Sequence, residues 1–118
     1  MYRRIAQRGI GLAAAVLCAS QALAQNWATL GTSDNGAVWS IDKDSIVSGR
    51  DGLVYFTDQN SSNGQTETAD EAVDCARRLQ YTLKINDDFM QGWRDVPNHI
   101  VADSAMDAVL KYVCANAG

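Results

Sequence analysis

The stretch Ala72-Val-Asp-Cys-Ala-Arg-Arg-Leu-Gln-Tyr-Thr-Leu-Lys-Ile85 decides the fold that this sequence predicts. Apolar side chains prevail at its odd positions and polar side chains at its even positions, which is the period of a β-strand with one buried and one solvated face. We therefore expect one long strand here, with Cys75 on its apolar face. Cys114 is the only other cysteine after Ala24, and it lies in an amphipathic segment at the C-terminus. The two segments predict a strand and a terminal helix joined by a disulfide.

The C-terminal segment has the spacing of a helix that packs on a sheet. Its apolar residues recur three and four positions apart and so share one helical face, namely Met106, Val109, Leu110, Val113 and Cys114. Ser104 and Asp107, three residues apart, are typical of a helix N-cap. We expect the apolar face to lie on the sheet.

Shorter β-like runs precede the long stretch. We expect strands over residues 26–31, 37–42 and 53–57, and Asn35-Gly36 between the first two is a strong hairpin signal. The polar segment 58–70 holds nothing that can pack in a core, so a mobile loop is expected there.

A further run follows the long stretch. Residues 89–96 are expected to form a fifth strand with Trp93 turned inward, and Pro97 ends it because proline lacks the N–H that a ladder needs. The predicted fold class is therefore α+β. It is a small antiparallel sheet of about five or six strands with a C-terminal α-helix on one face, tethered by the disulfide.

The N-terminal region has the pattern of a secretory signal peptide. Three arginines precede an apolar run, and Ala22-Leu23-Ala24 forms a cleavage site before Gln25. The apolar run is too short to span a membrane. The alternative is a lipoprotein anchored at Cys18, but Leu17 stands where a small residue normally precedes a lipid-modified cysteine.

Cleavage of residues 1–24 would leave residues 25–118 as a single domain without a transmembrane segment. We expect it to be exported through the inner membrane and to reside in the periplasm, at the cell surface or outside the cell. An even pair of cysteines in an exported domain predicts the Cys75–Cys114 disulfide, which would close a loop of about 40 residues and contribute at most ~4 kcal/mol. Two free buried thiols are the alternative.

The charge balance limits the kind of partner. The chain carries 14 acidic and 10 basic residues for a net charge of −4, and three of the basic residues lie in the expected signal peptide. The remaining domain is more acidic still, which argues against nucleic acid or an anionic membrane as its main partner. A protein partner is expected, and the oligomeric state is left open.

A series of short motifs runs along residues 25–118. In order they are Trp27 with Gly31 and Gly36, Trp39-Ser-Ile-Asp42 with Ser45-Ile46, Val54-Tyr-Phe56, Asp74-Cys75 followed by Arg77-Arg78, and finally Trp93, Val96, Pro97, Ser104 and Leu110 to Cys114. This series, with its two cysteines, resembles the surface-adhesin protein E family over essentially the whole segment. The resemblance implies a curved antiparallel sheet with a C-terminal helix tethered by a disulfide.

The best-studied member of that family is an outer-membrane lipoprotein that binds host matrix proteins and haem. This chain departs from it in two places. Leu17 does not fit the motif that precedes a lipid-modified cysteine, and residues 98–103 look like extra length before the helix. The resemblance is therefore carried over for the fold and not for the ligands.

Little in the sequence points to catalysis. His99 is the only histidine and is expected to be a solvated loop residue, with haem ligation by His99 or a tyrosine as the alternative. Neither a nucleophile elbow nor a phosphate-binding glycine loop is present, so we expect no enzyme activity, bound metal or cofactor. Trp27, Trp39 and Trp93 are expected to pack against the helix, with an aromatic binding patch as the alternative.

The cationic residues of the long stretch suggest where a partner would bind. Arg77 is a charge on the apolar face. It either lies beyond the area that the helix covers, pairs with an aspartate such as Asp42, or binds an anion in a concave site. The strand period turns one row to the opposite face, made of Arg78, Gln80, Thr82 and Lys84. Arg78 and Lys84 are thus candidate partner-binding residues, with a merely solvated face as the alternative.

Two classes of function fit these observations. The first is a small exported binding domain, possibly adhesin-like in the sense of the resemblance, that recognises a protein or host ligand. The second is a structural or accessory subunit of a cell-envelope assembly without adhesive activity.

Overall fold

The computed structural model describes residues 25–117. The expected signal peptide, residues 1–24, lies outside the described residues. No helix within residues 25–117 has both the length and the apolar character that crossing a bilayer requires.

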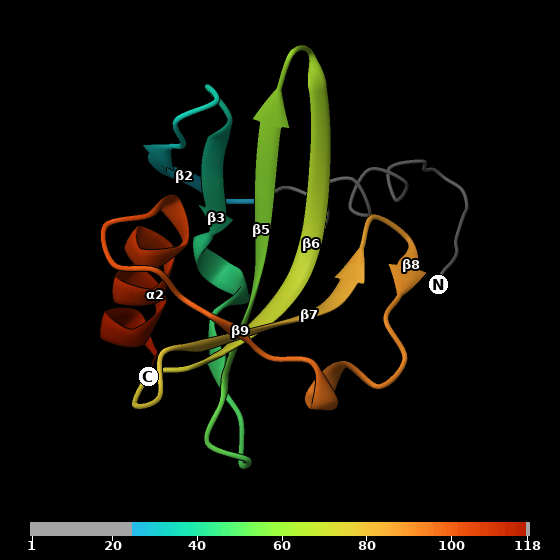
Figure 1. Cartoon of the computed structure of the whole chain (residues 1–118), viewed down its shortest axis with the longest axis vertical. Helices are drawn as coiled ribbons and strands as arrows, with labels where there is room; N and C mark the ends of the chain where they lie inside the picture. The colour runs from blue at the N-terminus through green and yellow to red at the C-terminus, as the bar shows by residue number, and fades with distance from the viewer. Residues whose placement is uncertain (1–24, 118) are drawn as a thin grey trace, which may run out of the picture.

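The described chain folds into an antiparallel sheet with one C-terminal α-helix (Figure 1). Within residues 25–117 the sheet has eight strands in the order β2-β3-β5-β6-β7-β8, with β4 paired to β5 and β9 paired to β7. The strands are β2 (Trp27–Thr32), β3 (Val38–Asp42), β4 (Val47–Ser48), β5 (Val54–Ser62), β6 (Gln65–Asp74), β7 (Leu79–Ile85), β8 (Asp88–Phe89) and β9 (Asn98–His99). The helices are the 3-10 turns η1 (Lys43–Ser45) and η2 (Trp93–Asp95) and the α-helix α2 (Ala105–Asn116).

The predicted fold class is confirmed, but the predicted number of strands is too low. One additional strand arises because the expected long strand divides into β6 and β7, and the other two are β4 and β9, which are only two residues long. So short a strand carries no readable alternation of apolar and polar residues, and only its pairing with a longer neighbour reveals it.

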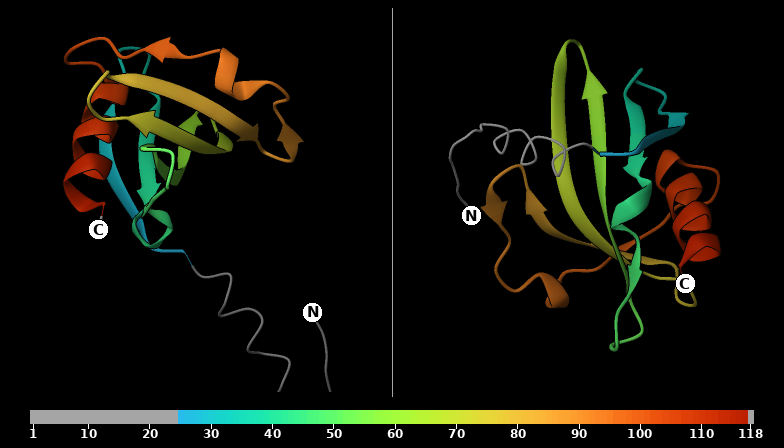
Figure 2. Two further views of the ribbon diagram at one scale, coloured as in Figure 1. Left: turned by 90° about the horizontal axis from the view of Figure 1, so that it is seen from below. Right: turned by 180° about the vertical axis from the view of Figure 1, so that it is seen from behind.

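The helix covers one face of the sheet, which we call the inner face. Figure 1 shows α2 beside β2 and β3, and the views of Figure 2 show β7 bending away across the far end of the sheet. The core between helix and sheet consists of buried apolar side chains from both, namely Ile41, Val54, Phe56, Val73, Ile100, Val109, Leu110 and Val113. The predicted helical face is confirmed, since Val109, Leu110 and Val113 are its buried members. Ser104 caps the helix by accepting a hydrogen bond from the Asp107 N–H at 3.1 Å.

The polar segment 58–70 is not a mobile loop, and that prediction is wrong. Its residues extend β5 and β6 into a long hairpin, paired from Asp58 with Ala69 to Ser62 with Gln65. The hairpin turns at Asn63-Gly64, whose φ angles are 51° and 77°. Two consecutive positive φ angles match the twist of paired strands, so a two-residue turn can continue the ladder without any apolar side chains.

The stretch 72–85 is not one strand, which corrects the central prediction. β6 ends at Asp74, and a turn over residues 75–78 leads into β7. Arg78 closes the turn with a φ of 57°, and its N–H donates to the Asp74 carbonyl at 2.9 Å. Apolar and polar residues alternate both before and after the turn, so the sequence resembles that of a single strand. This alternation does not show that the chain reverses direction.

The expected strand over residues 89–96 is also wrong beyond Phe89. Gly92 adopts a left-handed conformation with a φ of 70°, and the η2 turn follows it. Trp93 therefore leaves the inner face and packs edge-on against Tyr55 and Tyr81, with ring centroids 6.2 and 5.7 Å away. Both tyrosines alternate with inner-face residues along their strands, so this cluster lies on the opposite, outer face.

Candidate binding sites

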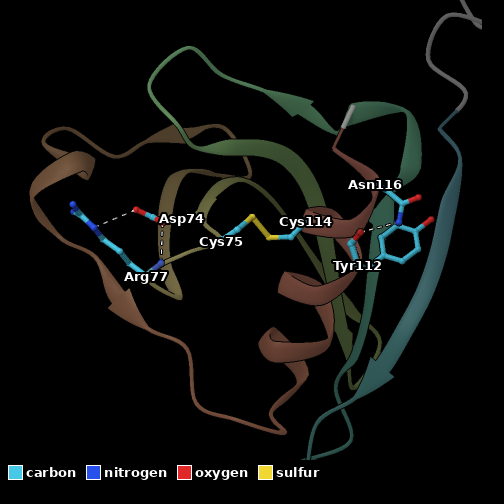
Figure 3. The surroundings of a disulfide bond; sticks show 6 residues. All are labelled: Asp74, Cys75, Arg77, Tyr112, Cys114 and Asn116. Carbon is cyan, nitrogen blue, oxygen red and sulfur yellow. Dashed lines mark hydrogen bonds and ion pairs between the residues drawn. A yellow bond between two sulfur atoms is a disulfide. The ribbon is translucent and has the colours of Figure 1, made fainter.

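The predicted disulfide between Cys75 and Cys114 is present, with the two Cα atoms 6.0 Å apart. Figure 3 shows that it joins the β6–β7 turn to the last turns of α2. Arg77 lies in the same exposed turn, where its backbone N–H donates to Asp74 Oδ1 at 3.0 Å and its Nε is 3.8 Å from Asp74 Oδ2. Its partner is thus Asp74 and not Asp42, and it lies outside the concave inner face.

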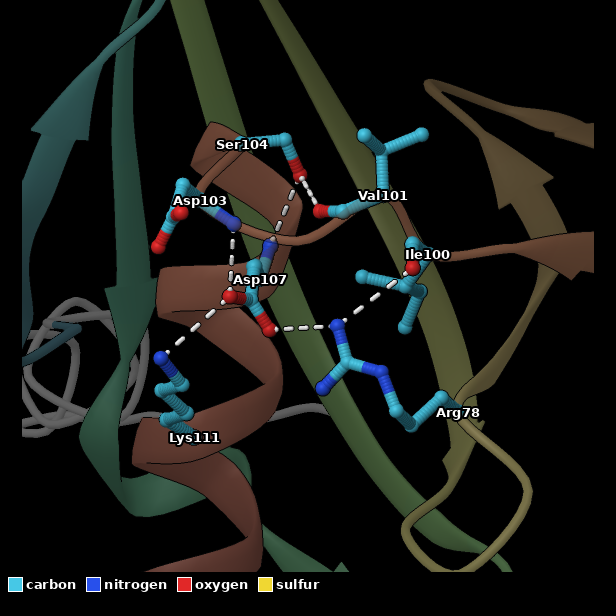
Figure 4. Close-up of polar contacts among 7 residues, drawn as sticks. All are labelled: Arg78, Ile100, Val101, Asp103, Ser104, Asp107 and Lys111. Atoms are coloured by element: carbon cyan, nitrogen blue, oxygen red, sulfur yellow. Dashed lines mark hydrogen bonds and ion pairs between the residues drawn. The ribbon is translucent and has the colours of Figure 1, made fainter.

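Arg78 contacts the helix. Its Nη2 donates to Asp107 Oδ1 at 2.8 Å and to the Ile100 carbonyl at 3.3 Å (Figure 4). The other Asp107 oxygen accepts from the Asp103 N–H at 2.9 Å and lies 3.3 Å from Lys111 Nζ. The Asp103 N–H, and then the Arg78 guanidinium, lower the pKa of Asp107 to about 2. Arg78 therefore anchors the β6–β7 turn to the start of α2.

The predicted row of Arg78, Gln80, Thr82 and Lys84 does not share one face. Arg78 precedes β7, and a register shift separates the remaining members, because Thr82 pairs with Glu71 whereas Lys84 pairs with Asp70. Paired residues point to the same face, and the adjacent Asp70 and Glu71 point to opposite faces. The extra residue in β7 thus turns Lys84 to the outer face while Thr82 stays on the inner one. That the two cations bind a partner stays an untested prediction.

The inner face carries a cavity of about 350 Å³ beside the start of α2. We call it the inner-face cavity. Its lining comes from β3, β6, β7, β9, the segment that leads into the helix and the first turn of α2, and consists of Trp39, Glu67, Ala69, Glu71, Gln80, Thr82, Ile85, His99, Ile100, Val101, Ser104 and Met106. No lysine or arginine belongs to this described lining, although it contains two glutamates.

A buried pair of carboxyl groups has one member, Glu71, in this lining. Glu71 is 5% exposed, and Asp58, on the same face of the neighbouring strand, is 1% exposed. Hydrogen bonding between the two side chains raises the pKa of Asp58 and lowers that of Glu71, and a hydrogen bond between carboxyl groups requires that one of them keeps a proton. Burial, and then the negative charge of Glu71, raise the pKa of Asp58 to about 9. We therefore assign the proton to Asp58 at neutral pH.

Glu71 is the other member of the pair. Burial raises the pKa of Glu71, but hydrogen bonds from Asp58 and from the Gln80 side-chain amide oppose this shift. Gln80 Nε2 also donates to Thr82 Oγ1 at 2.9 Å, and Gln80 Oε1 accepts from Asn98 at 3.3 Å. The amide is thus held by β7 and β9, and it orients the Glu71 carboxylate at the cavity.

The sequence contains a pattern that indicates this pair, but the prediction of a loop from the polarity of residues 58–70 missed it. Asp58 follows Val54 and Phe56 at intervals of two, and Glu71 precedes Val73 by two. Both acids therefore continue rows of apolar residues that face the core. Treating residues 58–70 as a loop hid this relationship.

The three tryptophans do not form one patch. Trp39 lines the inner-face cavity, and its Nε1 is buried without a hydrogen-bond partner among residues 25–117. Trp93 packs on the outer face, and Trp27 lies half-buried in β2. His99 is exposed in β9 and lines the same cavity as Trp39. No cluster of three metal-binding side chains is found within the described range.

A second hollow, of about 440 Å³, opens at the end of the sheet between β7 and the segment that follows β8. We call it the outer-face groove, and its lining is Thr82, Phe89, Met90, Gln91, Trp93, Val96 and Asn98. Thr82 also lines the inner-face cavity, so the two hollows adjoin at this residue. Arg94 covers the Trp93 ring at 4.3 Å and donates to Asp51 at 3.1 Å. These contacts hold the indole rigidly at the wall of the groove.

Geometry and composition together define a small disulfide-tethered α+β domain with two hollows that could hold a ligand. Comparison with protein-family models, with curated protein sequences and with solved structures gave no match to this chain. Membership of the surface-adhesin protein E family therefore stays a prediction from the residues that carry the resemblance.

Proposed function

We propose that residues 25–118 form an exported binding domain, without enzyme activity, that recognises a protein partner through the outer-face groove. One observation carries this proposal. Phe89 and Val96 are 62% and 64% exposed, and both line the same groove of this acidic domain. Adjoining exposed apolar side chains around a hollow are typical of sites where proteins bind one another.

The groove offers a partner a preformed wall. Trp93 is fixed between Tyr55, Tyr81 and Arg94, so little side-chain entropy would be lost when a ligand contacts it. Tryptophan held in this way is a frequent centre of binding energy in protein interfaces. The occupant that fits is an apolar side chain of a partner protein.

The charge beside the groove adds to the description of the partner. Lys84 pairs with Phe89 across β7 and β8, so the two side chains share the outer face. Within residues 25–117 Lys84 takes part in no ion pair. An acidic group of the partner, next to its inserted apolar side chain, would complement the charge of Lys84. Lys84 therefore remains a candidate partner-binding residue.

The resemblance to the surface-adhesin protein E family supports an adhesin-like form of this proposal. The alternative, an accessory subunit of an envelope assembly, uses the same groove for a different kind of protein. The identity of the bound protein separates the two, since a host matrix protein supports the first and an envelope protein the second.

The experiment compares capture of proteins from envelope and host-matrix fractions by three immobilised forms. These are the native domain, the double variant Phe89→Asp with Val96→Asp, and the control Val47→Asp. Val47 is 55% exposed in β4 and lines neither the groove nor the inner-face cavity, so the control adds a charge to an apolar surface position elsewhere. We expect a protein that the native domain and the control retain and that the double variant loses, with all three melting at similar temperatures. Equal recovery by the double variant would show that the groove is not the docking site, and concentration-dependent dimerisation lost only in that variant would identify a second copy as the occupant.

Export is tested separately from binding. The intact mass of the protein recovered outside the inner membrane should correspond to a chain that begins at Gln25. A fatty-acylated chain that begins at Cys18 would replace this proposal with a membrane-anchored form.

A further inference from the structure

Two arginines line a further hollow of the domain, of about 220 Å³. We call it the arginine pocket. Arg77 comes from the β6–β7 turn, where Figure 3 shows its side chain pointing away from the disulfide, and Arg94 comes from η2. The Arg77 and Arg94 side chains are 78% and 60% exposed, so a ligand can reach both guanidinium groups. The rest of the lining is Asp51, Leu53, Asp74 and Tyr81.

The fold itself supplies hydrogen-bond donors to the two aspartates of this lining. Asp51 Oδ1 accepts from the Leu53 N–H at 3.1 Å. Asp51 Oδ2 accepts from Arg94 Nη1 at 3.1 Å and from the Tyr55 hydroxyl. Asp74 Oδ1 accepts from the backbone N–H of Arg77 at 3.0 Å. Both acids are therefore satisfied within the domain.

The two arginines, by contrast, have N–H donors that no acceptor uses. Arg77 Nε lies 3.8 Å from Asp74 Oδ2, which is longer than a hydrogen bond, so the Arg77 guanidinium has no hydrogen-bond acceptor among residues 25–117. Arg94 uses Nη1 toward Asp51 and Nη2 toward the Tyr55 hydroxyl, the latter at 3.4 Å. Each guanidinium carries more N–H donors than these contacts occupy. The pocket thus presents unused donors of two cations at one place.

The pocket adjoins the outer-face groove. The Arg94 guanidinium lies 4.3 Å over the Trp93 ring, and the same ring packs against Tyr81 of the pocket. Trp93 also lines the groove. A partner that places an apolar side chain in the groove could therefore reach the arginines with a neighbouring group. Since these contacts already fix Arg94, its binding would cost little side-chain entropy.

The charge of the lining favours an anion with a single charge. Two arginines and two aspartates make the lining neutral overall, so a phosphate dianion would be repelled by the aspartates more strongly than a monoanion. A carboxylate carries one negative charge, and its two oxygens match the planar fork of a guanidinium group.

We propose that the arginine pocket binds a carboxylate group of the protein that occupies the outer-face groove. Arg77 and Arg94 donate to the carboxylate oxygens, while the adjacent apolar side chain of the partner enters the groove. This inference rests on the proposed function, because it names a second contact of the same partner. An acidic side chain and the carboxylate at a chain end both supply the required chemistry.

The test observes the Nε–H signals of the arginines by NMR while small probes are added. Nα-acetyl-glutamate-N-methylamide carries a side-chain carboxylate, the corresponding glutamine compound is its neutral isostere, and Nα-acetyl-alanine carries a terminal carboxylate. The signals are assigned with Arg77→Lys and Arg94→Lys. Arg50, which is exposed and does not line the pocket, is the internal control.

We expect the Arg77 and Arg94 signals to move with both carboxylates and not with the glutamine compound. The carboxylate that binds more tightly identifies the source, a side chain or a chain end. Equal movement of the Arg50 signal would overturn the proposal, because it would mean that the probes meet any exposed arginine. Binding of the glutamine compound or of inorganic phosphate as tight as that of the glutamate compound would also overturn it.

Variants locate the charge that matters. Arg77→Met should weaken binding of the glutamate compound roughly two- to fivefold, the range of a solvent-accessible ion pair. Arg77→Lys should weaken it less, because lysine keeps the charge but not the fork of donors. The control Lys43→Met removes a positive charge at an exposed position in η1 outside the pocket and should leave the affinity unchanged. An equal loss in the control would mean that the probe responds only to the overall charge.

Capture by the immobilised domain distinguishes a failure of this inference from a failure of the proposed function. Arg77→Met should retain the partner less well than the native domain and Lys43→Met do. Full retention by Arg77→Met, together with loss in the double variant Phe89→Asp with Val96→Asp, would overturn this inference and leave the proposed function standing. Binding of the glutamate compound to a domain that captures no protein would refute the proposed function and keep the pocket as a carboxylate site.

Discussion

Arg78 Nη2 donates a 2.8 Å hydrogen bond to Asp107 Oδ1 and so ties the turn between β6 and β7 to the first turn of α2. Asp107 is only 2% exposed, so its carboxylate depends on the donors around it. The disulfide joins the same turn to the other end of the helix. The helix is thus held on the sheet at both ends, by an ion pair and by a covalent bond.

Removing the ion pair should loosen the start of the helix. Arg78→Met leaves Asp107 with one cation fewer, and unsatisfied buried charges are costly, so the melting temperature should fall by several degrees. Asp107→Asn should lower it too, and the double variant should lose less than the sum of the two. Calorimetry on the four proteins measures this coupling, and strictly additive losses would mean that the two side chains do not stabilise each other. Arg77→Met is the control, because Arg77 is exposed in the same turn.

Loss of the disulfide should destabilise the domain without changing its fold. Cys114→Ser removes a cross-link for which the chain-entropy model gives ~2–4 kcal/mol, so the melting temperature should fall by many degrees. Alkylation of the native protein without reductant should leave Cys75 and Cys114 unmodified. Mass spectrometry that found both cysteines alkylated in folded protein would contradict the bond.

The carboxyl pair predicts how stability depends on pH. In the unfolded chain Asp58 loses its proton near its ordinary pKa of 3.8, whereas in the folded state it keeps the proton up to about pH 9. Between these values the folded state binds more protons, so raising the pH lowers the free energy of unfolding. The melting temperature should therefore fall from mildly acidic toward alkaline pH.

The variant Asp58→Asn tests the assignment. Its amide can still donate to Glu71 but does not titrate, so the decline across this range should flatten, while the control Asp88→Asn should retain it. The contribution of Asp107 falls in a different window. Its lowered pKa of about 2 means that its stabilisation is lost as the pH falls from about 4 to 2. An unchanged decline in Asp58→Asn would place the responsible proton elsewhere.

The docking face of α2 gives a test by charge insertion. Leu110 is 4% exposed in the core, so Leu110→Asp should prevent folding or nearly so. Ala115→Asp introduces the same group at an exposed position of the same helix and should cost under ~1 kcal/mol. Circular dichroism distinguishes the two, and similar losses would show that the helical face is misassigned.

The turn of the β5–β6 hairpin requires a left-handed backbone. Gly64 has a φ of 77° and free space around its Cα, so an added methyl group would meet no clash. Gly64→Ala should therefore lower the free energy of unfolding only by the cost of the left-handed conformation, about 1–2 kcal/mol. Gly31→Ala is the control, since that glycine also has free space but an ordinary φ. Chemical denaturation should separate the two variants, and equal stability would contradict the assigned turn.

The sequence by itself determined the features that depend on neighbours along the chain. The helical face of Val109, Leu110 and Val113, its Ser104 cap and the strands near residues 26–31, 37–42 and 53–57 all follow from local periodicity and capping. The cysteine count identified the bond between Cys75 and Cys114, because only two cysteines remain after Ala24. These features needed no knowledge of which strands meet.

Only the tertiary structure decided the features that depend on pairing between distant strands. Apolar and polar residues alternate on both sides of the β6–β7 turn, so the alternation does not reveal the turn. The extra residue in β7, which turns Lys84 away from Thr82, can be recognised only from the pairing of β7 with β6. The two hollows were equally hidden. Asp58 and Glu71 meet because β5 pairs with β6, and Trp93 reaches the outer face because Gly92 redirects the chain after β8. Local sequence specifies the elements, whereas the register between them sets which side chains meet.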